Sequence, residues 1–312
     1  MTQKQVFDVA YQPQVKTCRD TRAMMLDVII ALIPASAFAV IRFGIHVLFV
    51  ILASVASAVF FEWAYRKLMK KDNRIGDFSA SITGLLLALV LPPQTPWWIP
   101  VIGSFFAIVV VKQLYGGIGK NFLNPALAGR AFLLASYAGI LGSVSIDGVT
   151  TATPLGYMYA GRELPYTLKE MFMGSIPGAV GEVSAVAVII GGAYLLVRGV
   201  ISWRIPASFL GTAAIISLIS GHTGYDSNFE WMLLNLTSGG IMLGAFFMAT
   251  DYATSPVTGG GQLLYGFGCG ALTMLIRYFG GYPEGVTYAI LIMNLCSWAI
   301  DKAFKRKQFG AE

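Results

Sequence analysis

Apolar stretches of membrane-spanning length follow one another along most of this chain. Runs of roughly 20 uncharged residues, each long enough to cross about 30 Å of hydrocarbon as a helix, recur from Met24 almost to the C-terminus. The pattern predicts an all-α integral membrane protein with about ten transmembrane helices. We place them at residues 24–41, 45–65, 76–91, 97–114, 125–141, 180–197, 205–220, 231–250, 263–279 and 286–300.

The polar segments between these helices are short except for one. Residues 142–179 form a connection of about 38 residues that is rich in turn formers, charges and threonines. Long connections often carry function, so this loop is the first place to look for a site. We expect a tail at residues 1–23, a membrane domain at 24–302 and a second tail at 303–312.

The composition excludes an ordinary soluble protein. Hydrophobic residues make up 56% of the chain and charged residues only 12%, whereas a soluble domain is about 25% charged. The polar N-terminal tail lacks the short apolar stretch and the cleavage site of a signal peptide. We therefore expect the first helix to remain in the mature protein.

The charge pattern predicts the orientation in the membrane. With both termini in the cytoplasm, eighteen of the 22 lysines and arginines lie inside, and only Arg42, Arg162, Lys169 and Arg277 lie outside. This asymmetry is what the positive-inside rule requires. The net charge of +6 therefore reflects orientation in the lipid membrane, and we expect no nucleic acid as partner. The long loop is predicted to be extracytoplasmic.

Few residues are available to hold a metal cofactor. Cys18, Cys269 and Cys296 are far apart and show no CxxC spacing, so neither a disulfide framework nor an iron–sulfur cluster is expected. His46 and His222 are the only histidines, so paired haem ligands are not expected. We predict no metal site, and any redox cofactor should be organic.

The long loop contains one ordered motif, DGVTTATPLG, at residues 147–156. By composition alone it is a solvated turn, because Asp, Gly, Thr and Pro all favour turns. Its order is more specific, since Asp147, Thr150, Ala152 and Thr153 fit the pattern D-x-x-[ST]-x-A-T. This heptad resembles the flavinylation site of the RnfD and NqrB family.

Three further strings resemble motifs of that family in the same order. They are DFSASITGLLLALVLPP at residues 77–93, GKNFLNPALAGRAF at 119–132 and MATDYATSP at 248–256. The resemblance thus covers nearly the whole chain. RnfD is favoured over NqrB because the N-terminal tail is short and because DGVTTATPL is closer to the RnfD form.

The resemblance implies a covalent cofactor. A flavin transferase would esterify FMN to Thr153 through a phosphodiester, with Asp147, Thr150 and Ala152 as its recognition elements. The chain would be a membrane electron-transfer subunit of an ion-translocating ferredoxin:NAD⁺ oxidoreductase in a prokaryotic cell membrane, incomplete as an enzyme alone. Its partners would resemble RnfA, RnfB, RnfC, RnfE and RnfG, and the ion would be Na⁺ or H⁺.

A second, noncovalent flavin is also expected from the resemblance. Asn121, Asn124, Asp251 and Thr254 are polar groups at predicted cytoplasmic helix ends. Their structural interpretation is helix capping and hydrogen bonding between helices. Their functional interpretation is a riboflavin site, because amides and carboxylates suit the ring edge and the ribityl hydroxyls.

Ionisable residues in or near the apolar segments are candidates for an ion path. They are Asp27, Asp77 and Glu182, with Arg277 as a further charged residue in an apolar segment. The simpler interpretation, which we favour, is that their side chains reach the membrane interface.

Two other functions fit parts of the sequence. An NqrB-like subunit of a Na⁺-pumping NADH:quinone reductase would add a quinone site. A channel or solute transporter without redox function would use the polar groups to line a pore, and the threonine loop would be only a turn.

Overall fold

The computed structural model describes residues 20–304 except positions 73–74, 143, 147–148, 152, 161, 163, 175, 183, 222–226 and 282–283. The first half of the described chain contains α1 (Thr21–Phe43), α2 (Ile45–Leu68), the 3-10 turn η1 (Ile75–Asp77), α3 (Ser79–Leu89), α4 (Trp98–Phe105), the π-helix η2 (Phe106–Gln113), α5 (Pro125–Ser136) and α6 (Ala138–Leu141).

The connection that follows contains β1 (Val144–Ile146), β2 (Val149–Thr151), α7 (Pro154–Tyr159) and α8 (Leu168–Met173). The second half contains α9 (Ala185–Val197), α10 (Arg204–Ser220), α11 (Asn228–Thr237), α12 (Ile241–Leu243), the π-helix η3 (Gly244–Met248), α13 (Gly259–Phe279) and α14 (Val286–Ala303). The two strands form an antiparallel hairpin in which Thr150 pairs with Ser145.

The helical class is confirmed, and the hairpin adds a small element of sheet. Within the described residues, α1 and α2 are each long and apolar enough to cross a membrane, and α11 with α12 and η3 makes a third span if the bent pair is counted as one. Several other apolar helices are shorter, with 10 to 17 residues. The count of ten spans and the orientation of the termini therefore stay predictions.

The helix predicted at residues 231–250 is broken. α11 ends at Thr237, and the chain bends by 66° before α12 and η3 continue it. Ser238, Gly239 and Gly240 form the break, and Gly239 has a positive φ of 66° that favours glycine. Arg277 of α13 donates hydrogen bonds to the carbonyl oxygens of Asn235 and Ser238 at 2.7 and 2.9 Å, so the interrupted backbone is satisfied.

The helix predicted from residue 180 begins later than expected. Ser184 caps α9 by accepting a hydrogen bond from the Ala187 N–H, and residues 179–182 are buried but not helical. The N–H groups of Val180 and Gly181 donate to the carbonyl oxygens of Leu91 and Leu89 at 3.0 and 2.6 Å. These contacts pair the turn at residues 179–182 with the end of α3, where Pro92 and Pro93 prevent further helix.

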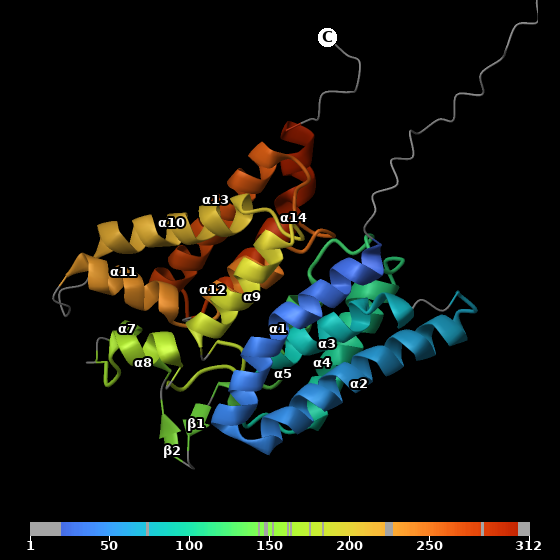
Figure 1. Ribbon diagram of the computed structural model, residues 1–312, viewed down its shortest axis with the longest axis horizontal. Helices are drawn as coiled ribbons and strands as arrows, with labels where there is room; N and C mark the ends of the chain where they lie inside the picture. Colours follow the sequence, from blue (N-terminus) through green and yellow to red (C-terminus); the bar gives the residue numbers. More distant parts are fainter. Residues whose placement is uncertain are drawn as a thin grey trace, which may run out of the picture.

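The two halves of the chain pack against each other through α1 and α9. Gly191 of α9 lies so close to α1 that a Cβ built on it would be 2.1 Å from the Ala31 carbonyl oxygen. α1 begins and α14 ends on the upper side of the molecule, whereas the hairpin, α7 and α8 lie at the lower side (Figure 1). The start of α1 and the end of α14 therefore lie away from the hairpin, α7 and α8.

Candidate functional site

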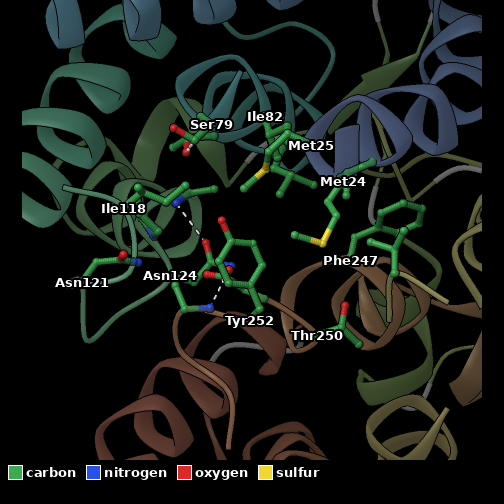
Figure 2. A pocket seen from close by; sticks show the side chains of 18 of the residues that line it. Met24, Met25, Ser79, Ile82, Ile118, Asn121, Asn124, Phe247, Thr250 and Tyr252 are labelled. Carbon is green, nitrogen blue, oxygen red and sulfur yellow. Dashed lines mark hydrogen bonds between the residues drawn. The ribbon is translucent and has the colours of Figure 1, made fainter. Parts of the chain in front are cut away.

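A cavity of about 340 Å³ lies between the N-terminal part of α1, α3, η2 and the turns that follow η2 and η3. Its apolar wall includes Met24, Met25 and Val28 of α1, Ile82 and Leu86 of α3, Leu195 of α9 and Phe247 of η3. Polar groups are contributed by Ser79, Thr83, Lys112, Asn121, Asn124, Thr250, Asp251 and Tyr252. Figure 2 shows the labelled side chains around this space, with Met24 and Phe247 on one side and Asn124 and Tyr252 on another.

Asn124 has both of the structural roles expected for it. Its Oδ1 accepts hydrogen bonds from the N–H groups of Ala126 and Leu127, which makes it the N-cap of α5 with Pro125 as the first helical residue. Its Nδ2 donates to the Met248 carbonyl oxygen at 3.2 Å, which ties α5 to the end of η3. Asn124 is buried on the cavity wall, so a ligand there would contact a fixed amide.

Asp251 follows η3 and is held in a turn. Its carboxylate accepts hydrogen bonds from the Ala253 N–H at 3.2 Å and from the Thr254 hydroxyl at 3.3 Å. Asp251 lines the cavity, whereas Thr254 is buried behind it as a supporting partner. Asn121 also lines the cavity, and its Nδ2 donates to the Leu123 carbonyl oxygen at 3.1 Å. The structure thus brings three of the four predicted riboflavin residues to one cavity.

Lys112 is a further charged group on the same wall, and it was not among the predicted site residues. Its Nζ donates to Glu62 Oε2 at 2.9 Å and to Ser79 Oγ at 2.6 Å. Glu62 is fully buried and also accepts a hydrogen bond from Gln113 at 2.6 Å. The available signal was an ionisable residue in each of two apolar segments, which often marks a functional position in a membrane protein.

The cavity suits a flat ring with polar edges. Its methionine and phenylalanine walls give an apolar surface, and its amide, carboxylate and ammonium groups converge from different elements, as in small-molecule sites of this size. The isoalloxazine ring of a flavin has this character, with an apolar benzenoid end and polar groups at the other end. The residues present therefore fit the predicted riboflavin.

Thr153 lies at the other side of the molecule, directly before α7. Its Oγ1 accepts a hydrogen bond from the Gly156 N–H at 3.2 Å, so it caps α7, and its side chain is partly exposed. Tyr159 at the end of α7 donates to Asn235 of α11 at 2.9 Å, which anchors the short helix to the helical body. Thr150 lies in β2, whereas Asp147 and Ala152 lie outside the described residues.

The ion-path candidates are distributed over three places. Asp27 of α1 is buried and accepts hydrogen bonds from the Tyr194 hydroxyl at 3.0 Å and from Arg198 at 3.1 Å. Asp77 accepts from the backbone N–H of Ser79 at 2.9 Å and from its hydroxyl at 2.7 Å. Each carboxylate therefore has a local structural partner.

Glu182 lies at a third place, at the end of the turn at residues 179–182. Its side chain is buried, and its Oε1 lies 3.7 Å from Nη2 of Arg130. Arg130 also donates hydrogen bonds to Glu284 and Thr287. Arg277 is fully buried as well, with 2% exposure. The expectation that these two side chains reach the membrane interface is therefore wrong, because packing of the broken segments encloses them.

Comparison with known proteins matches almost the whole chain to one protein family. The model of the family described as "NQR2, RnfD, RnfE family" matches residues 8–310. A protein of Acetobacterium woodii, named as a subunit of the Na(+)-translocating ferredoxin:NAD(+) oxidoreductase complex, is 48% identical, with 97% of this chain and 95% of the relative covered.

Two further relatives are similar over most of their length. One from Clostridium ljungdahlii, named as a subunit of the proton-translocating ferredoxin:NAD(+) oxidoreductase complex, is 40% identical over 98% of this chain and 97% of its own. One from Stutzerimonas stutzeri, named as a subunit of the ion-translocating oxidoreductase complex, is 35% identical over 92% of this chain and 91% of its own.

Proposed function

Because the chain belongs to the NQR2, RnfD, RnfE family, we propose that it is the RnfD-type subunit of an ion-translocating ferredoxin:NAD⁺ oxidoreductase complex in a prokaryotic cell membrane. The observation that carries this proposal is the identity of 48% over almost the full length of a relative named for such a complex. The chain acts as one subunit of an oxidoreductase, together with the other Rnf-type subunits. Its two sites, at Thr153 and at the cavity, are assigned to electron transfer.

Thr153 is the proposed acceptor of covalent FMN. In the transfer step, its Oγ1 bonds to the FMN phosphorus of FAD, the pyrophosphate bond breaks, AMP leaves and the hydroxyl proton passes to a base of the transferase. Asp147, Thr150 and Ala152 complete the recognised motif. Partial exposure of Thr153 and the anchoring of α7 by Tyr159 support this assignment, because the acceptor is accessible while its helix is held in place.

The cavity is the proposed site of a noncovalent riboflavin. A bound flavin would supply one-electron and two-electron carrier chemistry there. Asn121, Asn124 and Asp251 would hold its polar edge and ribityl hydroxyls, and the methionine and phenylalanine side chains would cover its apolar part. Thr254 would keep Asp251 oriented through their hydrogen bond.

The arrangement supports a route across the membrane. α7 and the start of α1 lie at opposite sides of the molecule, as an outer and an inner flavin would require (Figure 1). Electrons would arrive at Thr153 from an outer flavoprotein subunit and leave from the cavity at the cytoplasmic face. Asp27, Asp77 and Glu182 remain the candidates for coupling to Na⁺ or H⁺, and the names of the two similar relatives include both ions.

An NqrB-like function remains the second candidate because the same family model includes NQR2. The two are separated by the reaction of the purified complex: reduction of NAD⁺ by ferredoxin supports the Rnf assignment, and reduction of quinone by NADH supports the Nqr assignment.

The direct test of the redox assignment is the flavin content of the full-length chain made together with a flavin transferase. We expect one covalent flavin, visible as in-gel fluorescence under denaturing conditions, and one noncovalent flavin released on denaturation. A chain that contains neither flavin would favour a channel or transporter instead.

A further inference from the structure

A line of charged and polar side chains, buried except for the partly exposed Asp77, runs from α2 to the cavity. Arg66 Nε lies 3.5 Å from Glu62 Oε1, and the other oxygen of Glu62 accepts a hydrogen bond from Lys112 Nζ at 2.9 Å. Lys112 also donates to Ser79, whose hydroxyl donates to Asp77. Glu62 has no exposed surface, and the Lys112 side chain is only 3% exposed.

Lys112 is the member of this line that carries its charge to the cavity. Lys112 and Ser79 both line the cavity, whereas Glu62, Arg66 and Asp77 do not. Among the described lining residues, Lys112 is the cation and Asp251 the acid. An ammonium group has three donors, and the bonds to Glu62 and Ser79 use two of them. Among the described residues no third partner is present, so one donor is left for a molecule in the cavity.

The charge acts strongly because the side chains of Lys112 and Glu62 are both buried. Two unit charges 4 Å apart interact by about 1 kcal/mol in water and about 4 kcal/mol at an effective dielectric constant of about 20. A ring in the cavity that gains an electron becomes more negative and is stabilised by the nearby ammonium group. Glu62, one step farther from the cavity, weakens that effect and fixes the position of Lys112.

We infer that Lys112 sets the reduction potential of the noncovalent flavin in this cavity, with Glu62 as the positioning residue that moderates it. This inference rests on the proposed presence of that flavin. It predicts that removing the charge of Lys112 and removing the charge of Glu62 shift the reduction potential in opposite directions. If the salt bridge between α2 and η2 were purely structural, loss of either partner would have the same effect on the potential.

The test uses the full-length chain made without the flavin transferase, so that only noncovalent flavin is present. Redox titration with an optical readout measures its midpoint potential in the wild type and in each variant. Lys112→Met keeps the length of the side chain and removes the charge, and it should lower the preference for the reduced ring at least tenfold. For a one-electron step this corresponds to a decrease of the midpoint potential by about 59 mV.

Three other variants fix the interpretation. Glu62→Gln should shift the potential upward, because it removes the opposing charge and keeps an acceptor for Lys112. Lys112→Arg should stay near the wild type. Lys120→Met is the control, since Lys120 is an exposed lysine outside the cavity lining and its removal should leave the potential unchanged.

Each outcome decides between the ideas. Opposite shifts in Lys112→Met and Glu62→Gln support the inference, and if Lys112→Met loses its flavin, the upward shift in Glu62→Gln decides alone. Shifts of the same sign, or no shift, overturn the role of Lys112 and leave the flavin assignment standing. A wild-type chain without noncovalent flavin overturns both.

Discussion

Asn124 and Met248 are joined across the wall of the cavity, since the Asn124 amide donates to the Met248 carbonyl oxygen at 3.2 Å. This bond connects the cap of α5 to the last residue of η3, two elements that are far apart in the chain. The cavity therefore depends on the same amide that starts a helix.

Asn124→Leu should remove both the cap and this connection. We expect the noncovalent flavin content to fall at least tenfold, with about 1 kcal/mol of helix stability lost from the missing cap. Asn124→Ser separates the two effects, because serine caps a helix but cannot reach as an amide does. Asn228→Leu is the control at an exposed asparagine of α11. Unchanged flavin in Asn124→Leu would assign Asn124 to structure alone.

Thr153→Val should abolish in-gel flavin fluorescence, because valine has nearly the same shape and lacks the hydroxyl that attacks the pyrophosphate. Thr153→Ser keeps both the hydroxyl and the cap of α7 and should retain at least part of the signal. Thr151→Val removes a neighbouring hydroxyl in β2 and should retain it fully. Fluorescence that persists in Thr153→Val would place the flavin on another residue.

Gly191→Ala should destabilise the protein by about 2 kcal/mol or more, because the added Cβ would be 2.1 Å from the Ala31 carbonyl oxygen and α1 and α9 would have to separate. Gly211→Ala is the matched control in α10, where nothing lies within 4 Å of the added Cβ. There alanine should stabilise the helix by about 0.5–1 kcal/mol. The thermal midpoint of tryptophan fluorescence in detergent measures both, and equal midpoints would contradict the packing.

Arg277→Met should lower the same thermal midpoint. The change leaves the carbonyl oxygens of Asn235 and Ser238 without their donor at the break between α11 and α12. An unsatisfied buried acceptor costs about 1–3 kcal/mol. Lys302→Met near the end of α14 removes a charge from an exposed position and should have little effect. A midpoint that does not change in Arg277→Met would show that the break is satisfied in another way.

The topology can be tested with single cysteines on a background without the native three. Lys71→Cys and Lys169→Cys place thiols at two exposed positions, one after α2 and one in the connection that includes α8. The positive-inside rule predicts that a membrane-impermeant maleimide labels Lys169→Cys, but not Lys71→Cys, on intact cells. Labelling of both from outside would invalidate the predicted orientation.

Hydropathy was sufficient to locate the long apolar helices, but not their interruptions or the short helices α7 and α8. The first two predicted helices appear as α1 and α2, because a long apolar segment in a membrane satisfies its backbone hydrogen bonds by forming a helix. Residues 180–182 were predicted as helix because they continue an apolar run into α9. Their partner is the end of α3, and such a distant backbone pairing has no local signal.

Only some of the residues that line the cavity could be predicted from the sequence. Asn124 and Asp251 stand at helix ends, where polar residues are noticeable in an apolar sequence. Lys112 was counted with the cytoplasmic positive charges that determine orientation. Only the fold places Glu62 at 2.9 Å from it and closes both off from water.

The pairing of α3 with the segment 179–182 has a consequence for biosynthesis. The ribosome delivers Leu89 and Leu91 long before Val180 and Gly181, whose N–H groups are their partners in the finished protein. Until then these carbonyl oxygens need water or the insertion machinery, because hydrocarbon offers no donor. A nascent chain arrested between α5 and α9 therefore exposes an incomplete backbone, and we expect quality-control proteases to remove it.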